Sequence, residues 1–401
     1  MSNTQNTLLG NVRFIQLWAG QTISFVGDAV SMVALVILVV QLTGSASAVG
    51  GALVAHLLPT FASPLFGVLA DRFDRRVVLV VSDLVRATLV LGLVFVRDLV
   101  LIYCLIFLMG FARTLFNPTI RAAFPSVVGE GYLARANSLI GGSFSASVTV
   151  GPALGGLLVG VVGVSGAFLL DAATYLISAS LLSRIPLPRP QREGEEPSVL
   201  RELRSGFSYL AGARVPLAMM MGAFLTVLAT DLATPAEVFL AKSTFDAGDV
   251  GYGLLVSVWG GGMVLGSALM AVLGDRLRLL PAYFLGIFVW ALALASTGLS
   301  PTFVLALAML AVAGAANGLD NVVTDTILQR LVPNALLGRV FSVKYLGYGA
   351  GEALAYPAGG VLVDTLGPRS TFLVAGIVTA AVALLILLVL VGVSARDISS
   401  K

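Results

Sequence analysis

Long apolar runs separated by short polar segments are the feature that most restricts the fold of this chain. A helix needs about 20 apolar residues to cross the hydrocarbon core of a bilayer, and the chain offers twelve such runs. A membrane β-strand needs only about 10 residues and would show alternation of polar and apolar side chains. We therefore predict an all-α membrane protein with twelve transmembrane helices, which cover residues 14–40, 47–70, 77–97, 99–120, 137–162, 165–184, 215–240, 250–273, 279–299, 302–328, 340–365 and 370–393.

The composition excludes a soluble globular protein of this size. Hydrophobic residues make up 58% of the 401 residues and charged residues only 11%, whereas soluble domains contain about 25% charged residues. So little charge cannot cover a water-exposed surface. The single cysteine, Cys104, and the single histidine, His56, provide neither a disulfide framework nor the ligand spacing of a metal site. We expect no metal and no cofactor.

The distribution of positive charge predicts the orientation in the membrane. Cytoplasmic loops of membrane proteins are enriched in Lys and Arg. With the N-terminus in the cytoplasm, the opposite side of the predicted spans carries only Arg97, Lys242 and Arg369. This bias predicts a multi-pass protein of the cell (inner) membrane with both termini in the cytoplasm. The net charge of +3 lies in short clusters between the spans, so the expected partner is the lipid bilayer and not a nucleic acid.

One long polar stretch, residues 185–213, divides the chain. We predict an N-terminal six-helix half at 1–184, a cytoplasmic linker at 185–213 and a C-terminal six-helix half at 214–401. Duplicated halves are typical of secondary transporters, whose substrate site lies between the halves. The halves resemble each other weakly, because a glycine, a polar residue and a proline recur with the same spacing: Gly110, Asn117 and Pro125, and later Gly318, Asp325 and Pro333.

The segment after the second predicted span carries an ordered motif. It runs Gly67-Val-Leu-Ala-Asp-Arg-Phe-Asp-Arg-Arg76 and resembles the signature of the loop between helices two and three in the major facilitator superfamily, Gly-x-Leu-Ala-Asp-Arg-x-Gly-Arg-Lys. An aspartate stands where the superfamily has its second glycine. Gly67 permits close helix approach, Asp71 can face a helix N-terminus, and Arg72, Arg75 and Arg76 can bridge to carboxylates and headgroups. The resemblance implies a transporter with a gate at this loop; the alternative is a generic positive loop.

The fifth predicted span contains a second motif, Gly151-Pro152-Ala-Leu-Gly155-Gly156. In this superfamily the pattern Gly-Pro-x-x-Gly-Gly at this place resembles the antiporter signature, which is found mainly in exporters. Pro152 removes one backbone hydrogen bond and can kink the helix, and the glycines allow a neighbouring helix to approach closely. The alternative interpretation is ordinary packing of small residues between membrane helices.

Shorter segments along nearly the whole chain resemble one branch of the superfamily, the macrolide-efflux type of drug:proton antiporters, whose pattern the enterobactin-type siderophore exporters share. This resemblance implies proton-driven export of amphiphilic compounds from the cytoplasm. The fourth span departs from the superfamily, because Phe107 occupies the position of its usual arginine and Arg113 follows Gly110 instead. The matching segments are Leu17–Gln21, Gly27-Asp28, Arg135–Leu139, Glu202-Leu203 and Gly206-Phe207.

Carboxylates within the predicted spans are candidates for proton coupling. An ionisable residue in a membrane helix costs about 2.5–3.5 kcal/mol on insertion scales and is a functional hypothesis by default. In a medium of low polarity a carboxylate binds a proton more readily than in water, so protonation can bias one conformation over another. We predict that the coupling groups come from Asp28, Asp231, Asp320 and Glu352. The alternative for each is a structural role beside a buried basic residue or a helix end.

Polar side chains in the fourth and tenth spans are candidates for a substrate cavity. Asn317, Asp320 and Asn321 form a polar stripe on one face of an otherwise apolar helix, which only a cavity or a polar partner would favour. Arg113 and Asn117 are the corresponding candidates in the fourth span. Asp320 is already counted among the coupling candidates. The predicted cavity residues are therefore Arg113, Asn117, Asn317 and Asn321.

Two other features of the spans have structural explanations. Asp83 and Arg86 stand three residues apart in the third span and predict an intrahelical ion pair. His56 can titrate near pH 6.5 or can be a histidine that is simply satisfied by a neighbour.

The sequence as a whole predicts a secondary active transporter that exports small amphiphilic, drug- or macrolide-type compounds in exchange for protons by alternating access. The alternatives are a siderophore or metabolite exporter, a proton-coupled nutrient symporter of the same fold, and a receptor or scaffold that transports nothing. The chain has no Gly-x4-Gly-Lys-Ser/Thr loop, which argues against an ATP-driven pump. It also has no paired catalytic carboxylates with a soluble domain, which argues against a membrane enzyme. The expected partners are a small-molecule substrate and protons, and we expect a monomer.

Overall fold

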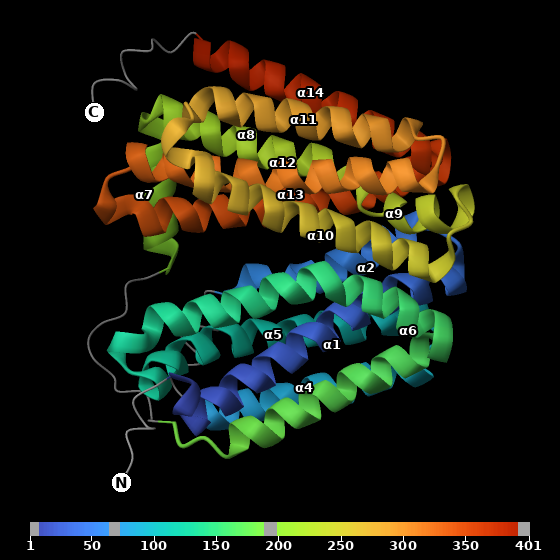
Figure 1. The fold of residues 1–401 in the computed structure, drawn as a ribbon, viewed down its shortest axis with the longest axis vertical. Helices are drawn as coiled ribbons and strands as arrows, with labels where there is room; N and C mark the ends of the chain where they lie inside the picture. Colours follow the sequence, from blue (N-terminus) through green and yellow to red (C-terminus); the bar gives the residue numbers. More distant parts are fainter. Residues whose placement is uncertain (1–7, 64–72, 188–198, 392–401) are drawn as a thin grey trace. The chain divides into compact units, whose positions relative to one another are not determined.

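Helices are the only regular structure in the residues that the computed structural model describes, which are 8–63, 73–187 and 199–391. Nine of the described helical stretches are long and apolar enough to cross a membrane. The prediction of an all-helical membrane protein is confirmed at this level (Figure 1).

Two compact units make up the fold. Unit 1 comprises Met1–Gly44, Ala55–Gly194 and Gly248–Ser257, and unit 2 comprises Ser45–Val54, Glu195–Ala247 and Val258–Lys401. Most of unit 1 therefore comes from the chain before the polar stretch at 185–213, and most of unit 2 comes from the chain after it. Each unit has its own apolar core, built from the buried side chains of its helices.

Polar residues cap the N-termini of α1, α4 and α5 in unit 1. The Asn11 side chain accepts hydrogen bonds from the backbone N–H groups of Arg13 (3.1 Å) and Phe14 (3.3 Å), and Asp74 and Asp98 cap α4 and α5 in the same way. Such caps satisfy backbone donors that lack a partner within the helix. The helices are α1 (Val12–Thr43), the end of α2 (Ala46–Leu57) with a 3-10 turn at Leu58–Ala62, α4 (Arg75–Phe95), α5 (Leu99–Val128) and α6 (Leu133–Ser183).

The longest helix, α6, is interrupted at Gly163. The backbone there has φ of 74° and ψ of 173°, a conformation that favours glycine because a Cβ atom would clash with the backbone. The interruption falls between the predicted spans 137–162 and 165–184. In the same way α4 ends at Phe95 and α5 begins at Leu99, between the predicted spans 77–97 and 99–120.

The helices of unit 2 follow the predicted spans with one interruption. They are α7 (Val199–Gly212), α8 (Arg214–Thr230), α9 (Ala236–Phe239), α10 (Gly248–Leu273), of which the first turns belong to unit 1, α11 (Leu279–Leu299), α12 (Phe303–Leu331), α13 (Asn334–Leu366) and α14 (Pro368–Val391). The predicted span 215–240 is not one continuous α-helix, because α8 ends at Thr230 and a 3-10 turn covers Asp231–Ala233. Pro235 follows this turn, and its ring and missing N–H oppose a continuous helix. Asp231 therefore lies at the end of α8 and not in the middle of a helix.

Glycines bring α10 and α12 into close backbone contact within unit 2. A Cβ atom on Gly314 would collide with the backbone carbonyl of Trp259, and one on Gly318 would collide with that of Met263. Small residues at membrane-helix interfaces permit such close approach. In lipid the hydrophobic effect does not drive helices together, so van der Waals packing between the backbones stabilises their contact instead.

Candidate functional site

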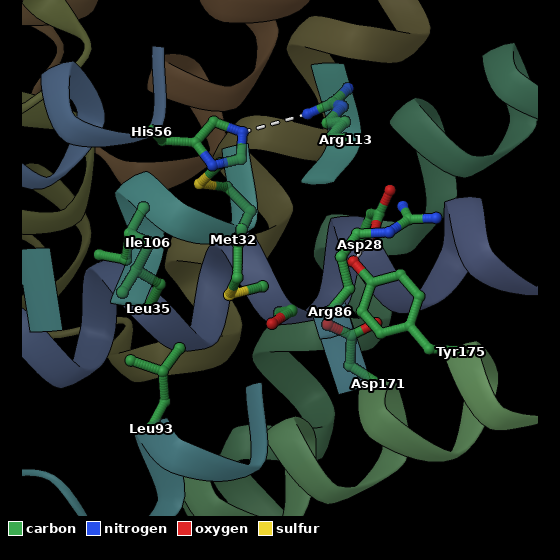
Figure 2. Close-up of a pocket in the computed structure, with 12 residues that line it drawn as sticks. Asp28, Met32, Leu35, His56, Arg86, Leu93, Ile106, Arg113, Asp171 and Tyr175 are labelled. Atoms are coloured by element: carbon green, nitrogen blue, oxygen red, sulfur yellow. Dashed lines mark hydrogen bonds between the residues drawn. The ribbon is translucent and has the colours of Figure 1, made fainter. Parts of the chain in front are cut away.

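A small pocket lined by both polar and apolar side chains lies inside unit 1 (Figure 2). Its volume of about 50 Å³ has room for water and not for a drug-sized molecule. Helices α1, α2, α4, α5 and α6 all contribute side chains, so the pocket exists only in the assembled unit. The polar residues that line it are Asp28, Ser31, His56, Arg86, Arg113, Asp171 and Tyr175.

Two carboxylates meet in this pocket. The Tyr175 hydroxyl donates a hydrogen bond to Asp28 Oδ1, which joins α6 to α1. Asp171, one turn before Tyr175, is fully buried and interacts electrostatically with Asp28. Thr174 Oγ1 lies 3.3 Å from Asp171 Oδ1, and the Ser31 hydroxyl of α1 also interacts with the Asp171 carboxylate. Two ionised carboxylates so close together in apolar surroundings repel each other, and one bound proton relieves this repulsion.

The guanidinium of Arg86 provides the positive charge of the cluster. Arg86 is 4% exposed and forms the predicted intrahelical ion pair with Asp83, which is 0% exposed. The Arg86 Cζ atom also lies 4.5 Å from the centroid of the Tyr175 ring and 4.3 Å from that of Phe116. Two cation–π contacts of Arg86 thus link α4 to α5 and α6, while the ion pair with Asp83 lies within α4.

A second cation, Arg113 on α5, contacts the ring of His56, with 3.1 Å between Nη1 and Nε2. The dashed line in Figure 2 marks this contact. His56 therefore has a polar partner inside the unit, as the second interpretation of this residue expects. Within the described ranges, no group of three or more His, Cys, Asp or Glu side chains is arranged to hold a metal ion.

A larger cavity is also lined by residues of unit 1, Arg113 among them. Its volume of about 680 Å³ is in the range of about 300–1,000 Å³ that is usual for small-molecule sites. Helices α1, α5 and α6 line it, and Arg113 lines both this cavity and the small pocket. The predicted cavity residues Arg113 and Asn117 both lie in its wall, together with Gln21, Phe25, Arg121, Phe124, Asn137 and Phe144.

The other predicted coupling residues fall into two clusters of unit 2. Asp231 and Glu352 lie close enough to interact electrostatically, and Glu237 and Tyr356 belong to the same group. No ion pair joins any of them to a basic residue in the described part of the chain. This group therefore consists of acidic side chains and a tyrosine.

The second cluster of unit 2 surrounds a buried lysine on α13. Lys344 is 2% exposed, forms an ion pair with Asp325 of α12 and lies 4.8 Å from the Tyr348 ring centroid. Asp320 is also buried and interacts electrostatically with Lys344 and Asp325. The neighbouring amides are paired with each other, since Asn321 Nδ2 donates to Asn317 Oδ1 at 3.1 Å.

The loop motif lies largely outside the described residues. Gly67, Asp71 and Arg72 belong to the range that the structure does not describe. Arg75 begins α4 and donates through Nη1 to the Ala122 carbonyl of α5 at 3.2 Å, and Arg76 is exposed. Of this predicted gate, the structure therefore accounts for one link between α4 and α5.

All four residues of the second motif, Gly151, Pro152, Gly155 and Gly156, are buried in α6. A Cβ atom on Gly155 would lie 3.1 Å from the Val30 Cα atom of α1, so this glycine allows α6 to pack against α1. The helix continues through Pro152.

Sequence reasoning missed Asp171 and Tyr175. Asp171 is an ionisable residue in the predicted span 165–184, which is the same signal that singled out Asp28. Tyr175 had no such signal, because a tyrosine in a membrane helix is common and its partner Asp28 lies in a different helix. The structure brings both residues to Asp28.

The sequence model of a family described as "transmembrane secretion effector", of the MFS type, matches residues 5–401. Macrolide efflux protein A of Streptococcus pyogenes is 24% identical over 387 residues, which cover 93% of this chain and 95% of that protein. The enterobactin exporter EntS of Escherichia coli O1:K1 is 29% identical over 363 residues, which cover 86% of this chain and 82% of that protein.

Solved structures with the same fold are also transporters. The nucleoside transporter NupG superimposes with a TM-score of 0.78 at 15% identity, covering 94% of this chain and 99% of that one. A bacterial homologue of the iron transporter ferroportin, solved in an inward-facing state, gives 0.75 at 16% identity, covering 98% and 100%. At these identities the likeness concerns the fold alone.

Proposed function

The chain belongs to the transmembrane secretion effector family of major facilitator transporters, and from that membership we propose that it exports small amphiphilic compounds in exchange for protons. Two relatives support the direction, since one is a macrolide efflux protein and the other an enterobactin exporter. The cavity of about 680 Å³ in unit 1 supports the size of the substrate.

The observation that carries the proton coupling is the hydrogen bond from Tyr175 to the half-buried Asp28, beside Asp171 and Arg86. A pair of carboxylates in an apolar unit costs free energy that a purely structural element would avoid. A proton on this pair removes one negative charge, whereas its loss restores the repulsion. If the two states favour conformations open to opposite sides of the membrane, the proton gradient drives the cycle. Asp231, Asp320 and Glu352 form the remaining pool of coupling groups.

The proposed topology is twelve transmembrane helices, six in residues 1–184 and six in 214–401, joined by the segment 185–213. The interruption of α6 at Gly163 supports two spans within that one long helix. Both termini lie in the cytoplasm, the protein resides in the inner membrane, and the working unit is a monomer.

Two motifs have proposed roles in the conformational change. The loop of Gly67, Asp71 and Arg72, with Arg75 and Arg76, acts as a cytoplasmic gate; the Arg75 contact with the Ala122 carbonyl supports a link between α4 and α5 there. The second motif, residues 151–156, allows close packing of α6 against its neighbours, which the position of Gly155 supports.

A siderophore exporter is the second candidate. The observation that favours it is the 29% identity to the enterobactin exporter, compared with 24% to the macrolide efflux protein. Both candidates share proton-driven export and differ in the substrate.

The test is flux in proteoliposomes with an imposed pH gradient, using a panel of macrolides, cationic dyes and siderophores together with a pH indicator in the lumen. Flux of any compound coupled to opposite proton movement supports the antiporter. Flux with protons moving in the same direction would replace it with a symporter. The absence of flux across the panel would contradict the export of such compounds and leave the family assignment unaffected.

A further inference from the structure

The large cavity of unit 1 has a charge pattern that selects among amphiphilic compounds. We propose that the exported compound is an amphiphilic organic anion, whose carboxylate, phenolate or similar group binds Arg113 and Arg121; this inference rests on the proposed export function and specifies its substrate class.

The described wall of the cavity carries positive charge. Arg113, Asn117 and Arg121 follow one another at four-residue spacing on α5, so that they share one face of the helix, and all three line the cavity. None of the described lining residues is an aspartate or a glutamate. The wall therefore offers positive charge and neutral hydrogen-bonding groups to whatever occupies it.

Arg113 has hydrogen-bond donors that its contact with His56 leaves unused. Its Nη1 group contacts a neutral acceptor, the His56 ring, and among the described residues no other hydrogen-bond partner or carboxylate binds its guanidinium. An arginine has five N–H donors in a planar arrangement that matches a carboxylate. A half-buried guanidinium with donors left over, facing a cavity, is a ready site for an anionic group.

Phenylalanine rings in the cavity wall form a surface for the apolar body of the ligand. Phe25 of α1 and Phe144 of α6 pack edge to face with 5.4 Å between ring centroids, and both line the cavity with Phe124. These rings give the cavity an apolar surface suited to an aromatic or aliphatic body. Gln21 and Asn137 add neutral polar groups. An amphiphile fits this wall, whereas a small inorganic anion would leave the aromatic surface unused.

The charge of the cavity wall disfavours a cationic ligand. A cationic amphiphile could use the rings, but it would face two guanidinium groups with no carboxylate in the described wall to compensate. Like charges that share one cavity repel each other. Among compounds of similar size and ring structure, the cavity should therefore prefer the anion.

The test uses two dyes with the same xanthene ring system and opposite charge, anionic fluorescein and the cationic tetramethylrhodamine ethyl ester. Binding to the purified full chain is measured by fluorescence anisotropy, and gradient-driven flux is measured in proteoliposomes. We expect fluorescein to bind at least roughly 10-fold more tightly than the ester, and Arg113→Gln or Arg121→Gln to weaken it by roughly 10-fold or more, as the loss of a charge-assisted hydrogen bond implies. Arg113→Lys and Arg121→Lys should retain part of the affinity, because they keep the charge.

Arg135→Gln is the matched control, because Arg135 is an exposed arginine of α6 that does not line the cavity; its fluorescein affinity should be unchanged. Tighter binding of the ester, fluorescein binding that is insensitive to both glutamine variants, or no binding of fluorescein would overturn the anion inference. Arginine-dependent binding of fluorescein without any gradient-driven flux would support the inference about the site and contradict the proposed export function. Gradient-driven flux of the ester without flux of fluorescein would support the proposed export function and contradict the anion inference.

Discussion

Arg113 Nη1 on α5 lies 3.1 Å from His56 Nε2 on α2. Because an arginine can only donate, His56 Nε2 must accept this bond, and the imidazole is then neutral with its proton on Nδ1. Arg113 also lines both the small carboxylate pocket and the large cavity. The bond therefore helps to position the positive charge of Arg113, which is the one described residue that lines both the pocket and the cavity.

Removal of the His56 acceptor should weaken substrate binding more than it slows turnover. His56→Leu leaves Arg113 without this partner, so we expect the KM for a transported anion to rise several-fold with a small change in maximal rate. His56→Gln keeps an acceptor oxygen and should restore most of the loss. Initial rates of flux in proteoliposomes measure both quantities, and equal KM values for the two variants would contradict the positioning role.

Tyr175→Phe tests the hydrogen bond to Asp28 with the loss of one oxygen atom. The ring that packs against Arg86 remains, so we expect folded protein with gradient-driven efflux reduced by roughly 10-fold, the order expected for a hydrogen bond to a charged group. Tyr345→Phe, an exposed tyrosine of α13, is the control and should transport normally. Efflux at the level of the control in Tyr175→Phe would remove the hydroxyl from the coupling mechanism.

Asp28→Asn and Asp171→Asn test the shared proton. Each replaces a carboxyl group by a neutral amide of the same shape, so gradient-driven efflux should be lost while substrate counterflow without a gradient continues. The second measurement separates loss of coupling from loss of binding. Full gradient-driven efflux by either variant would exclude that carboxylate as a coupling group.

Arg86→Gln should destabilise unit 1 strongly. The change leaves Asp83 buried and without its ionic partner, and breaking a buried ion pair in this way costs about 3–5 kcal/mol. The double variant Asp83→Asn with Arg86→Gln should recover part of this loss, because no unpaired charge remains. Thermal unfolding in detergent measures the series. The exposed Arg135→Gln should change stability by less than about 0.5 kcal/mol; a similarly small effect of Arg86→Gln would show that the pair is solvated.

Gly155→Val tests the packing of α6 on α1. The added Cβ atom would lie 3.1 Å from both Val30 Cα and Val33 Cβ, which is tighter than ordinary contact, and overpacking of this kind costs about 1–3 kcal/mol. We expect lower thermal stability and reduced flux. Gly142→Ala, on the same helix with no atom near its Cβ position, is the control, and indistinguishable stabilities of the two variants would contradict the close packing.

The sequence by itself determined what depends on local composition. Apolar length sets where a membrane helix can form, so most predicted spans coincide with helices, and the spacing of Asp83 and Arg86 sets their ion pair because residues three apart share a helix face. The family also followed from ordered motifs. The break after Thr230 was signalled by Pro235, although the prediction passed over it.

Only the tertiary structure decided which polar groups meet. Asp28 and Tyr175 are 147 residues apart in the chain, and their contact depends on the rotation of α1 and α6 about their own axes and on the close approach that Gly155 allows. Apolar membrane helices carry little pattern that specifies such rotation, since lipid and protein interior are similarly apolar. For the same reason the four predicted coupling carboxylates looked equivalent in sequence, and the fold placed them in three separate clusters.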